Sequence, residues 1–384
     1  MNGLGNAFTV SLVVVLLASP SARAVGVEPD NALQGLMSEA EPGAVVEVPA
    51  GVHRSPLTID KALTLKGKSP EECVVELTAD ESAVLVSSKA PVVIDSLTIK
   101  WQLVTREQRE EPACAVTVKD STVTLRNCRV IALGNFKRCP AAALVLGFSK
   151  VKLENCRFEG FEFTLLYGGG AEGSVTDCVF LNPGHCGATV HSGSKVEFAR
   201  NIITGSSYHG LRCTGGTILA HDNLIINNKN RGIYLGNKNA SGKVSNNVIV
   251  GNATGISAFA QTDVTIENNL MLDSSFAGLD SRDSCPITVR NNIFQNNAKG
   301  IVLFAKGGRN QVKLEKNSFW KNETDTEDID RPEDSILVDP RFTAPDQGDF
   351  TPQADELKTN EQGLSDPIVF RELWQKWEGI SKED

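Results

Sequence analysis

The sequence predicts an all-β solenoid in which three short strands make up each coil. First, an asparagine or cysteine returns nine times between residues 123 and 319, at intervals of 22 to 28 residues. Second, the positions three residues before and two residues after it are apolar in every repeat. Third, the apolar runs are three to five residues long and are separated by Gly, Asn and Asp, which is typical of strands and turns. A repeat of this length indicates a solenoid.

The repeated asparagines and cysteines are predicted to form a ladder inside the solenoid. Parallel strands lie about 4.8 Å apart, so equivalent residues of successive coils stack along the axis. A buried asparagine column can hydrogen-bond from coil to coil, and cysteine can take the same place as a small apolar group. The nine ladder positions are Cys128, Cys156, Cys178, Asn201, Asn223, Asn247, Asn269, Asn292 and Asn317.

Two recurring phrases carry a resemblance to a known family. They are Gly232-Ile233-Tyr234-Leu235 and Asn291-Asn292-Ile293-Phe294. With them, residues 44–319 resemble the right-handed parallel β-helix repeat family of the pectin-lyase-like superfamily. The resemblance implies a right-handed parallel β-helix that binds or modifies a polysaccharide. It leaves the activity open, because this fold serves lyases, hydrolases, epimerases, binding modules and adhesins.

The chain divides into four segments. Residues 1–24 are expected to be a signal peptide that ends in Ala22-Arg23-Ala24, with an uncleaved anchor as the alternative because no Lys or Arg precedes the apolar run. Residues 25–43 should contain a short amphipathic helix that caps the first coil. Residues 44–320 form the β-helix. Residues 321–384 form an acidic, irregular tail that ends in a helix beginning at Asp366, which packs on the coils or, alternatively, binds a partner.

Charge and cysteine content limit the candidate compartments and the candidate classes of partner. The net charge is −9, and the acidic excess lies in the tail, so no dense basic stripe favours nucleic acid. We expect a secreted, periplasmic or cell-surface monomer without membrane contact after signal cleavage. The nine cysteines are expected to be mainly buried thiols, with a Cys114–Cys139 disulfide as the alternative. No CxxC pair suggests structural zinc.

Function is expected on the outward columns of one strand per coil, which are counted from a recurrent glycine such as Gly210. The residues two and four positions after this glycine should face outward, and the direction of the residue before it is open. Three successive coils thereby bring together histidine, arginine and tyrosine side chains. The candidate catalytic residues are His209, Arg212, Arg231 and Tyr234, and the candidate substrate-binding residues are His191, Asp280, Arg282 and Lys299.

These residue types suit proton abstraction from C5 of a uronate. Arg212 or Arg231 would neutralise the sugar carboxylate as negative charge develops. His209 would act as the base and Tyr234 as the acid. The alternative interpretation is a solvated polar face, because the outward positions of any β-helix are polar. The sequence therefore leaves two functions open: a uronate polysaccharide lyase or C5-epimerase, and a non-catalytic carbohydrate-binding or cell-surface scaffold.

Other chemistries have less support in the sequence. Polygalacturonase-like hydrolysis needs several aspartates near the histidine, and no Asp-Asp pair precedes it here. The Arg-x-Pro and aspartate calcium cluster of pectate lyases is also missing, so no cofactor is expected and calcium stays open without support from the sequence. Arg282 is predicted to stack between Phe259 and Phe304, either as a sugar-binding platform or, as we favour, beneath the C-terminal segment.

Overall fold

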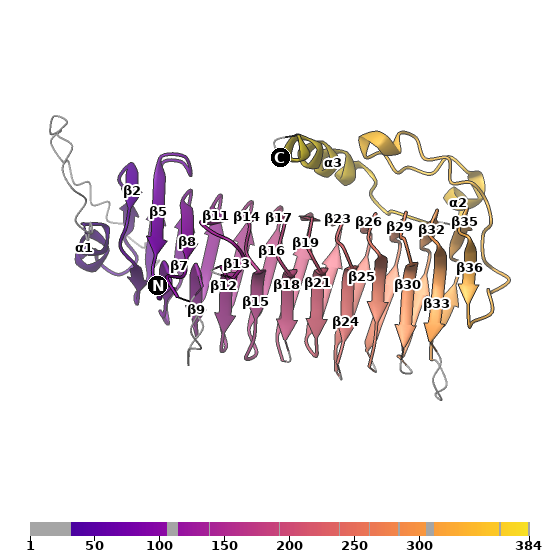
Figure 1. The fold of residues 1–384 in the computed structure, drawn as a ribbon, viewed down its shortest axis with the longest axis horizontal. Coiled ribbons are helices and arrows are strands. Elements are labelled where there is room, and N and C mark those ends of the chain that lie inside the picture. Colours follow the sequence, from indigo (N-terminus) through magenta and orange to yellow (C-terminus); the bar gives the residue numbers. More distant parts are fainter. Residues whose placement is uncertain are drawn as a thin grey trace, which may run out of the picture.

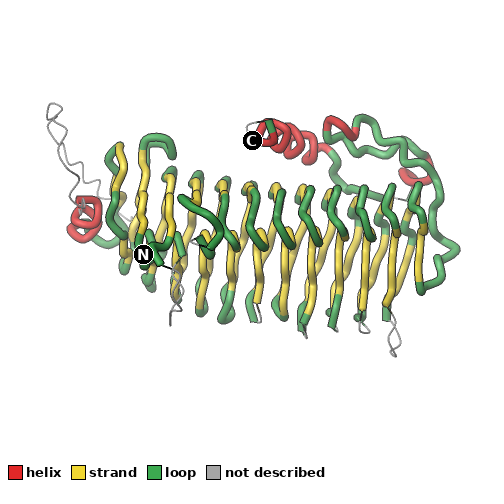
Figure 2. Tube along the Cα trace, in the orientation of Figure 1, coloured by secondary structure: helices red, strands yellow, loops and turns green. Residues whose placement is uncertain are grey.

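The computed structural model describes residues 32–382, except 106–113, 138, 192, 238, 261, 283–284, 305–310 and 361. The described chain is an elongated stack of coils with a helix at one end, and its C-terminal segment folds back along one side (Figure 1). Figure 2 shows the three strands of each coil separated by short turns. In the described residues the strands form three parallel 12-stranded sheets, called A, B and C here. The predicted all-β solenoid with a helix near each end is confirmed.

Each coil contributes its strands in the order A, B, C. Sheet A contains β1 (Val45–Glu47), β4 (Leu63–Lys66), β7 (Val92–Asp95), β10 (Thr122–Arg126), β13 (Lys150–Glu154), β16 (Glu172–Thr176), β19 (Lys195–Ala199), β22 (Thr217–His221), β25 (Ser241–Ser245), β28 (Asp263–Glu267), β31 (Ile287–Arg290) and β34 (Lys313–Glu315). Sheet B contains β2 (Gly51–His53), β5 (Cys73–Thr78), β8 (Thr98–Gln102), β11 (Arg129–Ala132), β14 (Arg157–Glu159), β17 (Val179–Leu181), β20 (Ile202–Thr204), β23 (Leu224–Ile226), β26 (Val248–Val250), β29 (Leu270–Leu272), β32 (Ile293–Gln295) and β35 (Ser318–Trp320). Sheet C contains β3 (Leu57–Ile59), β6 (Val84–Val86), β9 (Val116–Lys119), β12 (Ala141–Leu146), β15 (Phe163–Tyr167), β18 (Cys186–His191), β21 (His209–Thr214), β24 (Arg231–Gly236), β27 (Thr254–Ala258), β30 (Ala277–Arg282), β33 (Lys299–Phe304) and β36 (Thr324–Glu327). The helices are α1 (Ala32–Glu39), the 3-10 helix η1 (Pro345–Gln347), α2 (Asp355–Thr359) and α3 (Ile368–Ser381).

The predicted ladder is confirmed, and it forms the turn between sheets A and B. The backbone N–H of Asn223 donates to Asn247 Oδ1 at 3.0 Å, and Asn223 Nδ2 donates to the same oxygen at 2.9 Å. The residue before a rung has a positive φ, 57° at Asp222 and 55° at Asn246, which Asp and Asn tolerate better than most residues. The buried turn is thus satisfied without water. All nine cysteines are buried free thiols, so Cys114 and Cys139 form no disulfide.

A second ladder, which the sequence analysis missed, forms the turn between sheets B and C. The backbone N–H of Asn228 donates to Asn252 Oδ1 at 3.0 Å, and that of Asn297 donates to Asn322 Oδ1 at 3.1 Å. Each of these asparagines follows a rung of the first ladder by five residues, which is a visible sequence signal. Because Asn322 continues the pattern, the last coil extends past residue 320, and β36 pairs with β33.

The N-terminal helix covers the open edge of the first coil. Leu33 and Met37 of α1 are buried against the core. The side-chain amide of Gln34 forms the hydrogen bonds that a neighbouring strand would otherwise form. Its Oε1 accepts the Thr58 N–H at 2.8 Å, and its Nε2 donates to the Thr58 carbonyl at 3.2 Å. Edge groups of β3 that would otherwise meet only solvent are therefore paired.

The C-terminal segment packs on the outer face of sheet B. From β17 to β32 the outward side chains are mainly apolar as well as the inward ones, as in Val179-Phe180-Leu181 and Leu270-Met271-Leu272. These outward side chains form one cluster with Phe350, Leu357 and Phe370 of the tail. Packing of the terminal helix on the coils is therefore confirmed. Placement of the tail over the Arg282 stack was wrong, because the apolar surface that the tail needs lies on sheet B.

The described residues contain no helix long and apolar enough to cross a membrane. The expected signal peptide, residues 1–24, lies outside the described residues.

Candidate functional site

The predicted site residues occupy three aligned columns on the outer side of sheet C. Strand pairing sets His209 beside Arg231, and Arg212 beside Tyr234. It also sets Ser257 beside Asp280. Because the strands pair in register, each column runs along the helix axis. The fold thus brings His209, Arg212, Arg231 and Tyr234 together on two neighbouring strands.

Aromatic rings and guanidinium groups stack along this face into one continuous arrangement, which we call the sheet C row. The ring centroids of His185 and Tyr208 lie 4.7 Å apart, and the stacking continues through His209 to Tyr234. From the preceding coil, the Phe163 ring contacts His185 at a centroid distance of 4.8 Å. The rings are packed against one another or against guanidinium groups, so the row presents ring edges and N–H groups more than open ring faces. The sheet C row comprises His185, Tyr208, His209, Arg231, Tyr234, Phe259, Arg282 and Phe304.

His209 is a buried, neutral imidazole within the row. Its ring lies 3.9 Å from the Tyr208 ring and 5.0 Å from the nearly parallel Tyr234 ring. It is 2% exposed, and its Nδ1 has no hydrogen-bond partner in the described protein. Burial, followed by the positive charges of Arg231 and Arg212, lowers the pKa of His209 to about 3. The imidazole is therefore uncharged at neutral pH and lies in an electropositive surrounding.

Arg231 is held on several sides. Its Nε donates to Ser257 Oγ at 2.7 Å, and its Nη1 donates to Asn230 Oδ1 at 2.9 Å. The guanidinium carbon lies 5.7 Å from the Tyr234 ring centroid and 5.2 Å from that of Phe259. An arginine fixed in this way is preorganised to meet an anion.

Arg282 stacks between two phenyl rings, as the sequence predicted. Its guanidinium carbon lies 4.9 Å from the Phe259 ring centroid and 4.1 Å from that of Phe304. Contacts of this kind attract the cation to the ring faces. The same stack leaves the two phenyl faces occupied by Arg282.

Asp280 lies in an outward column but is 0% exposed, so it is not accessible to a sugar. It accepts a hydrogen bond from Ser257 Oγ, and Arg282 Nη2 lies 3.8 Å from its Oδ2. Burial raises the pKa of Asp280, while the Ser257 hydrogen bond and the charges of Arg231 and Arg282 oppose the rise. Its assignment as a direct substrate-binding residue therefore needs revision: Asp280 supports the two arginines from beneath.

The remaining predicted residues lie at the ends of the site. His191 Nδ1 is 3.1 Å from Thr214 Oγ1, and burial together with Arg212 lowers the pKa of His191. Lys299 forms an ion pair with Glu327, with its Nζ 2.7 Å from Oε2, and lies 5.3 Å from the Phe276 ring centroid. Lys299 is thus already neutralised.

Sequence reasoning missed His185 and Tyr208. Both lie two residues before the recurrent glycine, one residue earlier than the column that contains His209 and Arg231. Burial and the charge of Arg212 lower the pKa of His185, as at His209 and His191. At all three histidines burial is the larger cause of the lowered pKa, and nearby arginine charge adds to it. In the described residues, no group of three or more His, Cys, Asp or Glu side chains is arranged to hold a metal ion.

Comparison with known proteins agrees with this architecture. A family model described as "Right handed beta helix region" matches residues 113–270, and one described as "Periplasmic copper-binding protein (NosD)" matches residues 212–335. No curated protein matches the chain by sequence. With its three parallel sheets, the chain has the fold of a right-handed parallel β-helix.

Three solved structures illustrate the structural likeness. The A-module of mannuronan C-5 epimerase AlgE6 from Azotobacter vinelandii has a TM-score of 0.58 at 14% identity, over 82% of this chain and 97% of that chain. The periplasmic alginate epimerase AlgG has 0.57 at 15% identity, over 79% of each chain. The surface adhesin PfbA of Streptococcus pneumoniae has 0.55 at 14% identity, over 81% of this chain and 92% of that chain. At such identities the likeness shows the fold alone.

Proposed function

We propose that this right-handed parallel β-helix binds an acidic polysaccharide along the sheet C row. The observation that carries the proposal is the row itself, in which Arg231 and Arg282 are fixed among stacked rings. Both arginines lie close to one buried carboxyl group, Asp280. An anionic ligand would complete the charge balance of this face.

The shape of the row suits a polymer. Equivalent side chains repeat about every 4.8 Å along the axis, so a ligand that lies parallel to the axis meets similar contacts in successive coils. The ring edges offer apolar contact to sugar C–H groups, and the guanidinium N–H groups can pair with carboxylates in two-bonded geometry. A bound carboxylate would also raise the pKa of His209 from its low value.

Two of the similar structures bear names that fit this proposal. One is named a mannuronan epimerase and another a surface adhesin, so the same fold hosts an enzyme acting on an acidic glycan and a surface protein. AlgG is named periplasmic, and so is the NosD family. These names, with the signal-like N-terminus, support our proposal of export to the periplasm or the cell surface. We propose a monomer that binds neither nucleic acid nor membrane.

Binding is tested by gel retardation in the presence of alginate or polygalacturonate and by calorimetry with oligomers of each. The double variant Arg212→Gln/Arg231→Gln should bind roughly a hundredfold more weakly, because each lost charged contact contributes about 1.5 kcal/mol or more. Arg54→Gln, just after β2 in the first coil, is the control far from the site and should bind as the wild type does. Equal affinity of the double variant and the wild type would refute the site.

A second candidate function is uronate proton transfer at His209 and Tyr234, favoured by their stacking at 5.0 Å beside Arg212 and Arg231. His209 would take the C5 proton while an arginine stabilises the carboxylate. Tyr234 would then return a proton to C5 from the other side, or protonate the glycosidic oxygen as the C4–O bond breaks. The low pKa and 2% exposure of His209 make it a weak base, so the geometry favours binding.

The two candidates are separated by assays of chemistry. Epimerisation incorporates solvent deuterium at C5, and elimination gives an unsaturated, ultraviolet-absorbing product. Turnover that His209→Gln and Tyr234→Phe abolish, without a change in thermal midpoint, would make the protein an enzyme. Retained binding without either signal on alginate, pectate and glycosaminoglycans would make it a non-catalytic binding protein.

A further inference from the structure

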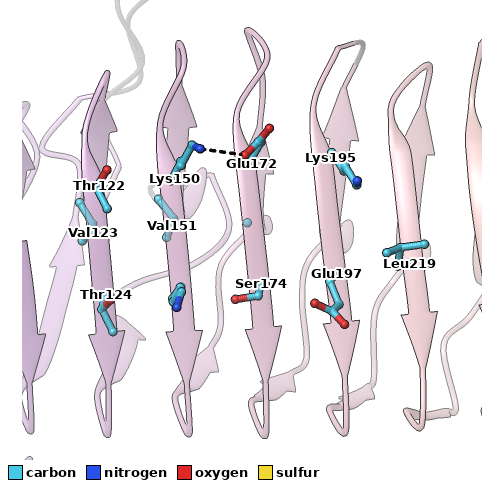
Figure 3. A pocket seen from close by; sticks show the side chains of 12 residues that line it. Thr122, Val123, Thr124, Lys150, Val151, Glu172, Ser174, Lys195, Glu197 and Leu219 are labelled. Atoms are coloured by element: carbon cyan, nitrogen blue, oxygen red, sulfur yellow. Dashed lines mark ion pairs between the residues drawn. The ribbon is translucent and has the colours of Figure 1, made fainter. Parts of the chain in front are cut away.

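A groove on the outer face of sheet A lies apart from the sheet C row. It has a volume of about 560 Å³ and crosses strands β10, β13, β16, β19 and β22. Figure 3 shows lysine and glutamate side chains on three of these strands, with shorter threonine and serine side chains beside them. The volume lies in the range of ligand-binding clefts.

The groove exists because small residues lie between long ones. Thr124 and Ser174 occupy outward positions on the strands that flank Lys152. Gly173 supplies no inward side chain, and the ring of Tyr167 fills that space from the core, within 3.0 Å of where a Cβ would stand. Short outward side chains therefore line the floor of the groove, and the longer side chains of lysines border it.

The groove carries an excess of positive charge. Glu172 is paired with Lys150 at 3.4 Å, the contact drawn in Figure 3. Glu197 is paired with His221 at 3.0 Å. Lys152 and Lys195 form no ion pair with any described residue of the groove. With both glutamates already paired, these two lysines are left to meet an anion.

An exposed aromatic ring stands at the edge of the groove. Phe148, two residues before Lys150, is 84% exposed. Its ring lies 3.5 Å from where a Cβ of Gly170 would stand, and a Cβ on Gly193 would meet only Gly170, at 3.7 Å. Glycines in the next two coils therefore keep this edge flat beside the ring. Phe148 thus offers the open ring face that the sheet C row does not.

We propose that this groove is a second binding site for a segment of acidic polysaccharide, which rests on the proposed function of the sheet C row. Phe148 would stack on the apolar face of a sugar ring, and Lys152 and Lys195 would bind carboxylates. The Thr124 and Ser174 hydroxyls are placed to hydrogen-bond sugar hydroxyls. Because sheets A and C face different directions, one protein molecule would hold two polysaccharide segments at once.

The test is titration calorimetry of the full chain with tetramers of mannuronate and of galacturonate, which are too short to occupy both faces. The wild type should bind two tetramers. Lys152→Glu/Lys195→Glu should weaken binding at the sheet A groove at least about tenfold, so that only one of the two sites is detected. Phe148→Ala should have the same effect. The matched control Lys66→Glu/Lys313→Glu makes the same charge change at the two ends of sheet A and should keep both sites.

The outcomes separate the two proposals. If the sheet A variants lose one site and Arg212→Gln/Arg231→Gln loses the other, the groove is a binding site. A wild type that binds one tetramer, lost only in the sheet C variant, refutes the groove and leaves the proposed function intact. Two sites that persist in the sheet A variants also refute the groove. Absence of binding to the wild type contradicts both proposals.

Discussion

Replacing His209 with phenylalanine should remove a large part of the acid sensitivity of the protein. The phenyl ring can keep the stacking on Tyr234, which lies 5.0 Å away, but it cannot take up a proton. The wild-type imidazole has a pKa of about 3 in the folded protein, against an ordinary value of 6.5. The unfolded chain therefore binds a proton in a pH range in which the folded chain does not.

The sign and size of the effect follow from this difference. A histidine whose folded pKa is lowered leaves stability intact above pH 6.5 and costs stability as the pH falls from 6.5 toward 3. At pH 4.5, two units below the unfolded pKa, the cost is about 2.8 kcal/mol, at about 1.4 kcal/mol for each unit. Because His209 is 2% exposed, little of this cost is screened by solvent.

The assay is urea unfolding of the wild type and of His209→Phe at pH 7.5 and pH 4.5. The difference in unfolding free energy between the two proteins should shift by about 2.8 kcal/mol in favour of the variant at the lower pH. His221→Gln is the control of opposite sign, because the Asp222 hydrogen bond raises the pKa of His221. With five histidines in the chain, imidazole NMR signals can be assigned by substitution. A difference that does not change with pH, or a His209 titration midpoint near 6.5, would refute the reasoning.

Three further predictions concern the ladder, the tail and metal ions. Asn247→Ala removes the hydrogen-bond partner of the buried Asn223 N–H and of the Ala220 carbonyl, and should lower the unfolding free energy by about 2–4 kcal/mol. Asn247→Cys introduces a residue that the ladder already contains and should lower it by less, so equal losses in the two variants would contradict the hydrogen-bonding role. Phe370→Ala removes a fully buried ring between α3 and sheet B and should lower the unfolding free energy by about 3–5 kcal/mol. Amide exchange in β23 and β26 should become faster while polysaccharide binding is unchanged, and unchanged exchange would mean that the helix is not held there. Polysaccharide binding should be the same in EDTA and in added calcium, because we propose contacts made by side chains alone; loss of gel retardation in EDTA would overturn this.

The candidate site was only partly accessible from the sequence, for a physical reason. The recurrent glycine gave the register, so the neighbours His209 and Arg231, and Arg212 and Tyr234, were predicted correctly. The exposure of each side chain was not predicted, because it depends on which other side chains cover it. Asp280 occupies an outward position and is nevertheless 0% exposed, with Arg282 of its own strand and Arg231 of another coil close to it.

The sequence by itself determined the repeat, the ladder and the inward columns, because a buried position in every coil must meet the same packing and hydrogen-bonding demands as those above and below it. The tertiary structure decided what happens on the outer faces. Sheet B is covered because both sides of β17 to β32 are apolar and the tail supplies the matching surface. Sheet C carries fixed arginines, and sheet A is hollowed beside Phe148. These outcomes depend on side chains from different coils and from the distant tail meeting in space, which no single repeat contains.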